Sequence, residues 1–120
     1  MATFTKVPLS ASTRGMPVKV AATATTGTTV HATGVSATTI DEVWLYAYNG
    51  STAAVLLTIQ YGEASASDDD IKLTVPPQSG LTLVVPGLVL SGTGAAAATV
   101  FAYASVANVV LLYGYVNRIA

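Results

Sequence analysis

His31 is the first candidate for chemistry, because it is the one histidine among 120 residues and the chain has no cysteine. A Ser-His-Asp triad or a zinc site would be built around that imidazole. His31 lies in a Thr-rich segment that carries no catalytic signature. One nitrogen ligand would also leave only carboxylates to complete a zinc tetrahedron. We therefore expect a structural or exposed histidine, no zinc site and no catalytic residues.

The acidic residues offer two further candidates for chemistry. Asp68-Asp69-Asp70 could supply oxygen ligands to a hard cation, but the spacing is not that of an EF-hand, and such a run is typical of a solvated loop. Asp41 and Glu42 are neighbours, so in a strand they would point to opposite faces, which is poor geometry for a carboxylate pair. The sequence predicts no metal site and leaves cation binding by the acidic loop open.

A glycine motif and an aromatic cluster complete the candidates. Gly92-x-Gly94-x-x-Ala97 partly matches the dinucleotide fingerprint, but that motif needs a following helix and a later acid, and no acid follows Asp70. We interpret it as a loop and expect no cofactor, with a small-molecule ligand disfavoured as well. Nucleic-acid platforms interleave aromatic residues with Lys and Arg, and here the five basic residues are scattered.

The aromatic cluster is therefore better explained as core or as a subunit interface. The aromatic residues considered are Trp44 and the tyrosines at positions 46, 48, 61, 103, 113 and 115, and those expected to contact a partner are Trp44, Tyr46 and Tyr48. The formal net charge of −1 creates no strong field for nucleic acid or an anionic membrane, so we expect neither as a partner. A carbohydrate- or receptor-binding module that uses these rings is the alternative, and an enzyme is disfavoured.

The elements that would carry these residues are short strands. Residues 40–62 hold two runs of alternating apolar and polar side chains around Asn49-Gly50-Ser51-Thr52, which predicts an antiparallel hairpin. About eight strands separated by turns predict an all-β fold, an antiparallel β-sandwich or jelly roll. The alanines of residues 94–108 leave a helix there as an alternative. The other predicted strands are residues 17–23, 28–35, 71–75, 81–85 with 88–90, 98–105 and 109–117.

The composition indicates one domain with apolar side chains to spare. The chain is 52% hydrophobic and 9% charged, against roughly 25% charged in a typical soluble domain. The surplus must face a second sheet or other chains. The longest apolar runs are far shorter than the roughly 20 residues that span a bilayer, and no secretion signal is evident, so we expect a protein made in the cytosol.

Residues 1–16 are predicted to form an extended arm, and residues 17–120 the β-sandwich domain. The arm has few large apolar residues, a proline, a glycine and no clear period. A disordered tail is one interpretation. The other is an arm that becomes ordered only against a partner, with Phe4, Val7 and Leu9 as apolar anchors and Lys6 and Arg14 as charges.

Four segments carry a resemblance to known proteins: TTVHATGV, VWLYAYNGSTAAVLLTIQYG, DDDIKLTVPPQSGLTLVVPGLVL and VLLYGYVNRI. In this order of strands, an Asn-led turn, a polar loop and a Gly-Tyr strand, the chain resembles a family of small all-β virion proteins of tailed bacteriophages. The likeness rests on pattern and turns, not on a catalytic signature. The alanine run at residues 95–98 and the low charge depart from the family's pattern.

The resemblance implies a capsid decoration (cement) protein or a similar head accessory protein on the exterior of the virion. It implies a homotrimer that sits where subunits of the major capsid protein meet. A tail, neck or fibre component built on the same sandwich is the alternative. The residues expected to contact the partner are Phe4, Lys6, Val7, Leu9, Arg14, Trp44, Tyr46 and Tyr48.

Overall fold

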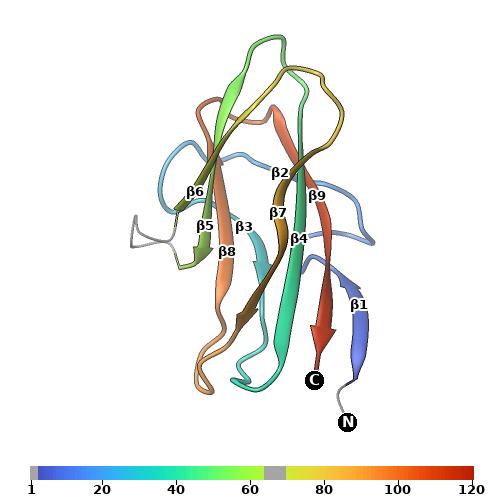
Figure 1. Ribbon diagram of the computed structural model, residues 1–120. Helices are drawn as coiled ribbons and strands as arrows, with labels where there is room; N and C mark the ends of the chain where they lie inside the picture. The colour runs from blue at the N-terminus through green and yellow to red at the C-terminus, as the bar shows by residue number, and fades with distance from the viewer. Residues whose placement is uncertain (1–2, 64–69) are drawn as a thin grey trace.

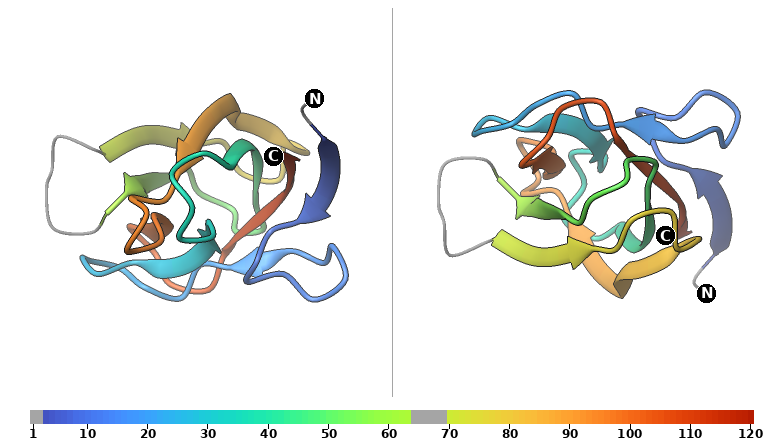
Figure 2. Two further views of the ribbon diagram at one scale, coloured as in Figure 1. Left: turned by 90° about the horizontal axis from the view of Figure 1, so that it is seen from below. Right: turned by 90° about the horizontal axis from the view of Figure 1, so that it is seen from above.

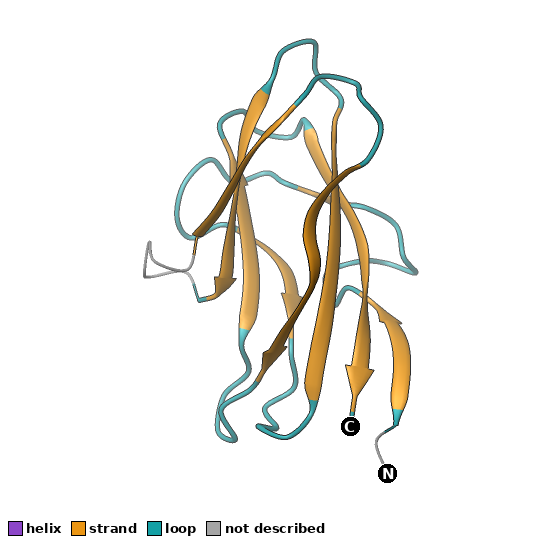
Figure 3. Cartoon of the chain, in the orientation of Figure 1, coloured by secondary structure: helices purple, strands orange, loops and turns teal. Residues whose placement is uncertain are grey.

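The computed structural model describes residues 3–63 and 70–120, and these residues form strands and loops without a helix (Figure 1 and Figure 3). The prediction of an all-β fold is confirmed. The nine strands in the described part are β1 (Phe4–Pro8), β2 (Val18–Lys19), β3 (Thr28–Ala32), β4 (Ile40–Asn49), β5 (Val55–Gly62), β6 (Asp70–Val75), β7 (Thr82–Ser91), β8 (Thr99–Ala104) and β9 (Val110–Ile119).

The strands form two antiparallel sheets that face each other. Sheet A has the order β1-β9-β4-β7, with β2 also paired to β9, and sheet B has the order β3-β8-β5-β6. Figure 2 looks along the strands and shows the two layers around a common interior. Most connections cross from one sheet to the other, whereas β5 and β6 follow each other in the chain and pair within sheet B. The arrangement is therefore sandwich-like.

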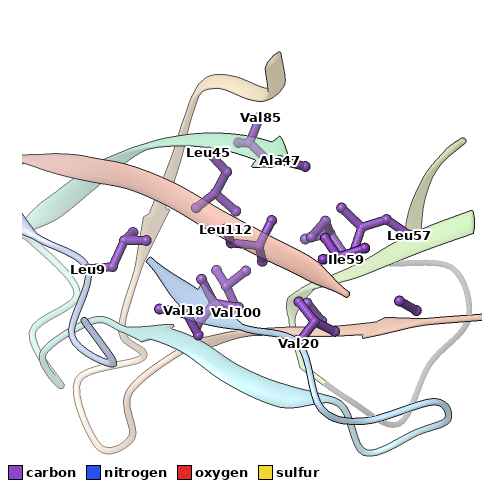
Figure 4. Packing of buried hydrophobic residues seen from close by; sticks show 14 of the residues in the cluster. Leu9, Val18, Val20, Leu45, Ala47, Leu57, Ile59, Val85, Val100 and Leu112 are labelled. Atoms are coloured by element: carbon purple, nitrogen blue, oxygen red, sulfur yellow. The ribbon is translucent and has the colours of Figure 1, made fainter. Parts of the chain in front are cut away.

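The core lies between the sheets because strands such as β4 and β8 alternate between a buried and a more exposed face. In β4 the buried positions are the odd-numbered ones from 41 to 49, and the even-numbered side chains point away from the core. Leu45, Leu57 and Leu112 from three different strands are fully buried (Figure 4). The two inner faces thus supply one continuous apolar layer.

The predicted hairpin over residues 40–62 is wrong, although both of its strands exist. β4 pairs with β7 and β9 in sheet A, whereas β5 pairs with β6 and β8 in sheet B. Alternation determines which face a residue occupies, but it does not identify the neighbouring strand. The residues between β4 and β5 cross from one sheet to the other instead of forming a tight turn.

The side chain of Asn49 organises this crossing. It is fully buried, and its Oδ1 accepts hydrogen bonds from the Ser51 amide (2.9 Å) and the Ser51 hydroxyl (2.7 Å). Its Nδ2 donates to the carbonyl oxygens of Ala53 (2.8 Å) and Val75 (3.0 Å). One amide therefore holds the crossing and the end of β6 together.

Two further expectations differ from the structure. The break predicted at Pro86-Gly87 is bridged, because β7 continues through both residues with register shifts against β4. The helix alternative for residues 94–108 is wrong, since β8 lies in that range and pairs with β3 and β5. Small residues suit β8, whose alanines face the core.

The expectation of a free arm over residues 1–16 is not confirmed. β1 pairs with the last strand of its own chain, from Phe4 opposite Ile119 to Pro8 opposite Tyr115. Leu9, the next residue, is buried in the core. In this structure the segment is the edge strand of sheet A, and the division of the chain after residue 16 stays a prediction.

Residues 20–28 cover part of the outer face of sheet B. The Gly27 amide donates to Gln60 Oε1 (2.9 Å), and Gln60 Nε2 donates to Thr25 Oγ1 (2.8 Å). Gln60 and Thr58 are buried although they point away from the core. The two outer faces of the sandwich-like body therefore differ, since that of sheet A has no comparable cover in the described residues.

Candidate functional site: the outer face of sheet A

The outer face of sheet A carries a cluster of aromatic side chains. Trp44, Tyr46 and Tyr48 occupy the outward positions of β4, as their spacing predicted. Tyr115 and Tyr113 of β9 lie opposite Trp44 and Tyr46 in the register of the two strands. The sequence singled out these aromatic residues, and the pairing of β4 with β9 brings them together on one face.

Trp44 and Tyr115 form the centre of this cluster. Their rings are stacked, with centroids 6.2 Å apart and planes 13° from parallel. The Lys6 ammonium lies 4.6 Å from the centroid of the Tyr115 ring. Because β9 lies between β1 and β4, Lys6 and Trp44 both reach the Tyr115 ring, each from a neighbouring strand.

Gly87 in β7 continues this row on the other side of Trp44. Its φ is +79°, and a Cβ at this position would lie 2.7 Å from Cζ2 of the indole. A glycine is needed here for two reasons, the left-handed backbone and the close approach of the ring. Lys6, Tyr115, Trp44 and Gly87 thus form a fixed row across the four strands of sheet A.

The charges next to the aromatic pair are engaged within the chain. Glu42 Oε1 accepts hydrogen bonds from Trp44 Nε1 (2.7 Å) and Asn117 Nδ2 (3.1 Å). These two hydrogen bonds, that from Trp44 first, lower the pKa of Glu42 below its ordinary value. Lys6 is held over Tyr115. Glu42 and Lys6 keep their charges, and these contacts hold both side chains against the aromatic pair.

Aliphatic side chains extend the apolar area around the aromatic row. Phe4 is 70% exposed, Val89 59% and Leu83 47%, and the strand register puts each of them on the outer face. A shallow depression with a volume of about 130 Å³ is lined by Ile40, Val89, Leu90 and Ser91. Small-molecule sites usually have volumes of roughly 300–1,000 Å³, so this depression suits a side chain better than a metabolite.

The dimensions of the face are those of a protein interface. β4, β7 and β9 have ten residues each, and with β1 the face is four strands wide. At about 4.8 Å between strands and about 3.3 Å per residue, it covers roughly 600 Å². A standard protein–protein interface buries about 800 Å² on each partner. The face is thus large enough to carry most of one such contact.

A second group of functional side chains lies inside the molecule, and sequence reasoning missed it. Asp41 and His31 are each 1% exposed, and His31 Nε2 lies 2.7 Å from Asp41 Oδ2. Arg118 donates from Nε to Asp41 Oδ1 (2.8 Å) and from Nη2 to Oδ2 (2.9 Å). The cluster joins β3 of sheet B to β4 and β9 of sheet A.

The hydrogen bonds of this cluster fix the protonation of the imidazole. The Ser10 amide donates to His31 Nδ1 (3.0 Å), so Nδ1 is an acceptor and carries no proton. Nε2 is then the protonated nitrogen, and it donates to Asp41. Burial by itself would raise the pKa of Asp41, but the hydrogen bonds from Arg118 and His31 outweigh it and lower that pKa.

The same contacts determine what His31 can do chemically. Ser10 reaches the imidazole through its backbone amide, and its hydroxyl oxygen accepts the Ala32 amide at 2.7 Å instead. No serine hydroxyl lies on a nitrogen of His31, because one nitrogen faces that amide and the other faces Asp41. This geometry ties strands together, and it lacks an activated nucleophile.

The structure describes only part of the acidic loop for which cation binding was left open. Asp68 and Asp69 lie outside the described residues, and Asp70 begins β6. Asp70 Oδ1 is buried and has no hydrogen-bond partner among the described residues. Within residues 3–63 and 70–120, no three His, Cys, Asp or Glu side chains are placed to hold a metal ion together.

The expected partner-binding residues divide into two groups. Phe4 and Lys6 join the aromatic cluster on the outer face of sheet A. Val7 packs against the core and Leu9 lies inside it, so neither is displayed as an anchor in this structure. Arg14 lies in the loop before β2, where its guanidinium contacts the Met16 sulfur at 3.9 Å.

Comparisons with protein-family models, with curated proteins and with solved structures found no match for this chain. In the described ranges, no helix is long and apolar enough to cross a membrane.

Proposed function

We propose that this chain is a non-catalytic structural protein of a phage virion, which binds the capsid exterior as a decoration (cement) protein. The sequence resemblance suggests this role, and the outer face of sheet A is the observation that carries it. A decoration protein strengthens a shell by burying area across its subunits. A largely apolar face of roughly 600 Å², in which Lys6 and Glu42 are held by their neighbours, suits that task. The partner is then the major capsid protein, and the protein acts as a homotrimer.

We also propose that the sandwich-like body is a jelly roll. The orders β1-β9-β4-β7 and β3-β8-β5-β6, with connections that alternate between the sheets, support this assignment. Jelly rolls combine two Greek keys in two facing sheets, and they are frequent among viral capsid and lectin domains. The assignment is thus compatible with a virion role.

The proposal uses the face of sheet A rather than its edges. The β7 edge contains Pro86 and two register shifts, and the β1 edge carries Lys6 and ends at Pro8. Prolines, charges and bulges at an edge discourage the pairing of another strand. By contrast, Phe4 and Val89 are exposed apolar side chains on the face itself. In this proposal the N-terminal arm contributes Phe4 and Lys6 to the binding face of sheet A.

A carbohydrate-binding role is the alternative that the aromatic cluster invites. Sugars stack on the free faces of aromatic rings, but the ring of Tyr115 is already stacked with Trp44 and contacted by the Lys6 ammonium. This arrangement favours a protein partner. A tail, neck or fibre position in the virion would use the same face against a different protein.

The test is a binding assay with two leucine variants of similar exposure. Leu83, 47% exposed, lies on the outer face of sheet A opposite Tyr46, and Leu56, 42% exposed, lies on the outer side of sheet B. Purified protein is added to undecorated phage heads and the retained copies are counted. We expect Leu83→Glu to reduce retention at least tenfold and Leu56→Glu to leave it unchanged.

Two outcomes would overturn the proposal. Equal retention of both variants would show that another surface makes the contact. Failure of the wild-type protein to bind heads, together with binding to tails or to a glycan array, would exclude the decoration role. Circular dichroism of both variants checks that each remains folded, which exposed positions should permit.

A further inference from the structure

The N-terminal segment is attached to the rest of the molecule at two places. β1 pairs with β9 through its backbone, and most of its side chains are exposed. Beyond the buried Leu9, the Ser10 amide donates to His31 Nδ1 (3.0 Å) and the Ser10 hydroxyl accepts the Ala32 amide (2.7 Å). Residues 10 and 11 therefore connect the edge of sheet A to β3, the edge of sheet B.

We propose that the contact between Ser10 and His31 is an acid-sensitive latch, which holds residues 3–10 on the body and releases them when the imidazole is protonated at Nδ1. The proposal does not depend on capsid binding, and it would stand if another function were found. It concerns the hydrogen bond from the Ser10 amide to His31 Nδ1, because protonation of the imidazole turns this acceptor atom into a donor.

The latch requires the neutral imidazole that the hydrogen bonds define. Nδ1 accepts a hydrogen bond from the Ser10 amide, while Nε2 donates one to Asp41. An imidazolium carries a proton on both nitrogens and accepts none. Protonation would therefore direct the Nδ1–H at the Ser10 N–H, so that two donors face each other in a site that is 1% exposed. The Ser10 amide can avoid this only by moving away.

The charges around His31 keep the remainder of the cluster in place when the latch opens. Asp41 on β4 faces Nε2, and it pairs with an imidazolium at least as well as with the neutral ring. Arg118 on β9 shares that carboxylate. Tyr61 on β5 lies near enough to sense the charge of Asp41, and β8 presents the uncharged Val100 opposite His31. The hydrogen bond to Ser10 is thus the contact that protonation removes.

Release of this segment would uncover the outer edge of β9. Residues 115–119 of β9 pair with β1 on that side, so loss of β1 exposes backbone N–H and C=O groups that can accept another strand. The released residues would also become an extended arm, with Phe4 at its free end. Acid would convert a closed edge strand into a mobile segment and an open edge.

The test uses the wild-type protein and nuclear magnetic resonance. Long-range ¹H–¹⁵N correlation of the His31 ring should show an unprotonated Nδ1 and a protonated Nε2 at neutral pH. When the pH falls from about 7.5 to about 5, amide protection factors of Ser10, Thr5 and Val7, whose amides face His31 or β9, should drop at least tenfold. The drop should follow the protonation of His31, whereas Ala47 and Leu57 in the central strands keep their protection.

His31→Gln provides the matched variant, because its amide oxygen can still accept the Ser10 N–H but does not titrate. We expect the protection of the Thr5 and Val7 amides to be independent of pH in this variant. The same pH dependence in His31→Gln as in the wild type would overturn the proposal. So would unchanged protection while His31 titrates, or a His31 that stays neutral until the whole protein unfolds; these two results need no variant.

Discussion

Replacing Asn49 by alanine should destabilise the protein more than any other single polar substitution at the end of β4. The substitution leaves the fully buried Val75 carbonyl without its donor and removes the hydrogen bonds to Ala53 and Ser51. A buried unsatisfied acceptor costs about 1–3 kcal/mol, and each half-buried hydrogen bond contributes about 0.5–1.5 kcal/mol. The free energy of unfolding should therefore fall by about 2–5 kcal/mol.

Urea denaturation followed by the fluorescence of Trp44 measures this change, and the thermal midpoint should fall by roughly 10–15 °C. Ser51→Ala is the matched control, because it removes the hydroxyl bond to Asn49 and leaves both carbonyls satisfied. It should cost about 1 kcal/mol. A loss below about 0.5 kcal/mol for Asn49→Ala would refute the view that this side chain holds the crossing between the sheets.

Three further predictions concern titration and close packing. Because the pKa of Asp41 is lowered from its ordinary value of 3.8, the carboxylate contributes fully to stability above pH 3.8, and this contribution is lost as the pH falls below that value. The acid denaturation curve should therefore be shallower for Asp41→Asn than for the wild type. Burial, followed by the charge of Asp41, raises the pKa of Tyr61 to about 12. The contribution of Tyr61 to protein stability is therefore complete below pH 10.0 and is lost as the pH rises through about 12. Ultraviolet titration should show a late-ionising tyrosine that is absent in Tyr61→Phe. Gly114→Ala should lower the free energy of unfolding, measured by urea denaturation, by about 3 kcal/mol or more, because its Cβ would overlap the Trp44 carbonyl oxygen. Gly34→Ala is the control, since open space surrounds this position, and it should change that free energy by less than about 0.5 kcal/mol.

The sequence predicts the central strands well because alternation is a local property. Val43, Leu45 and Ala47 share one face of β4, and each is buried as its position indicates. The pairing of β4 and β5 could not be predicted in the same way, since the neighbours of a strand depend on the whole chain. Asn49-Gly50 is a strong hairpin signal, but here the asparagine side chain is used for a crossing between sheets.

The difference between local alternation and long-range strand pairing also explains which parts of the site the sequence did not predict. β1 carries no alternation, because most of its side chains are exposed, so nothing in its composition separates a strand from an arm. Asp41 did give a usable signal. It shares the buried face of β4 with Val43 and Leu45, and a carboxylate at such a position needs a charged or hydrogen-bonded partner. That signal could have directed attention to His31 and Arg118.

The two ends of the described chain are joined by a pair of backbone hydrogen bonds. Thr3 donates to the Ala120 carbonyl (2.8 Å), and Ala120 donates to the Thr3 carbonyl (2.9 Å). Peptides fused to the two ends would therefore emerge side by side, at the pole opposite the 50–54 crossing (Figure 1). The two halves of a split reporter fused at these positions would therefore lie close enough to associate. A linker of a few residues would also suffice to join Ala120 to Thr3 in a circular chain.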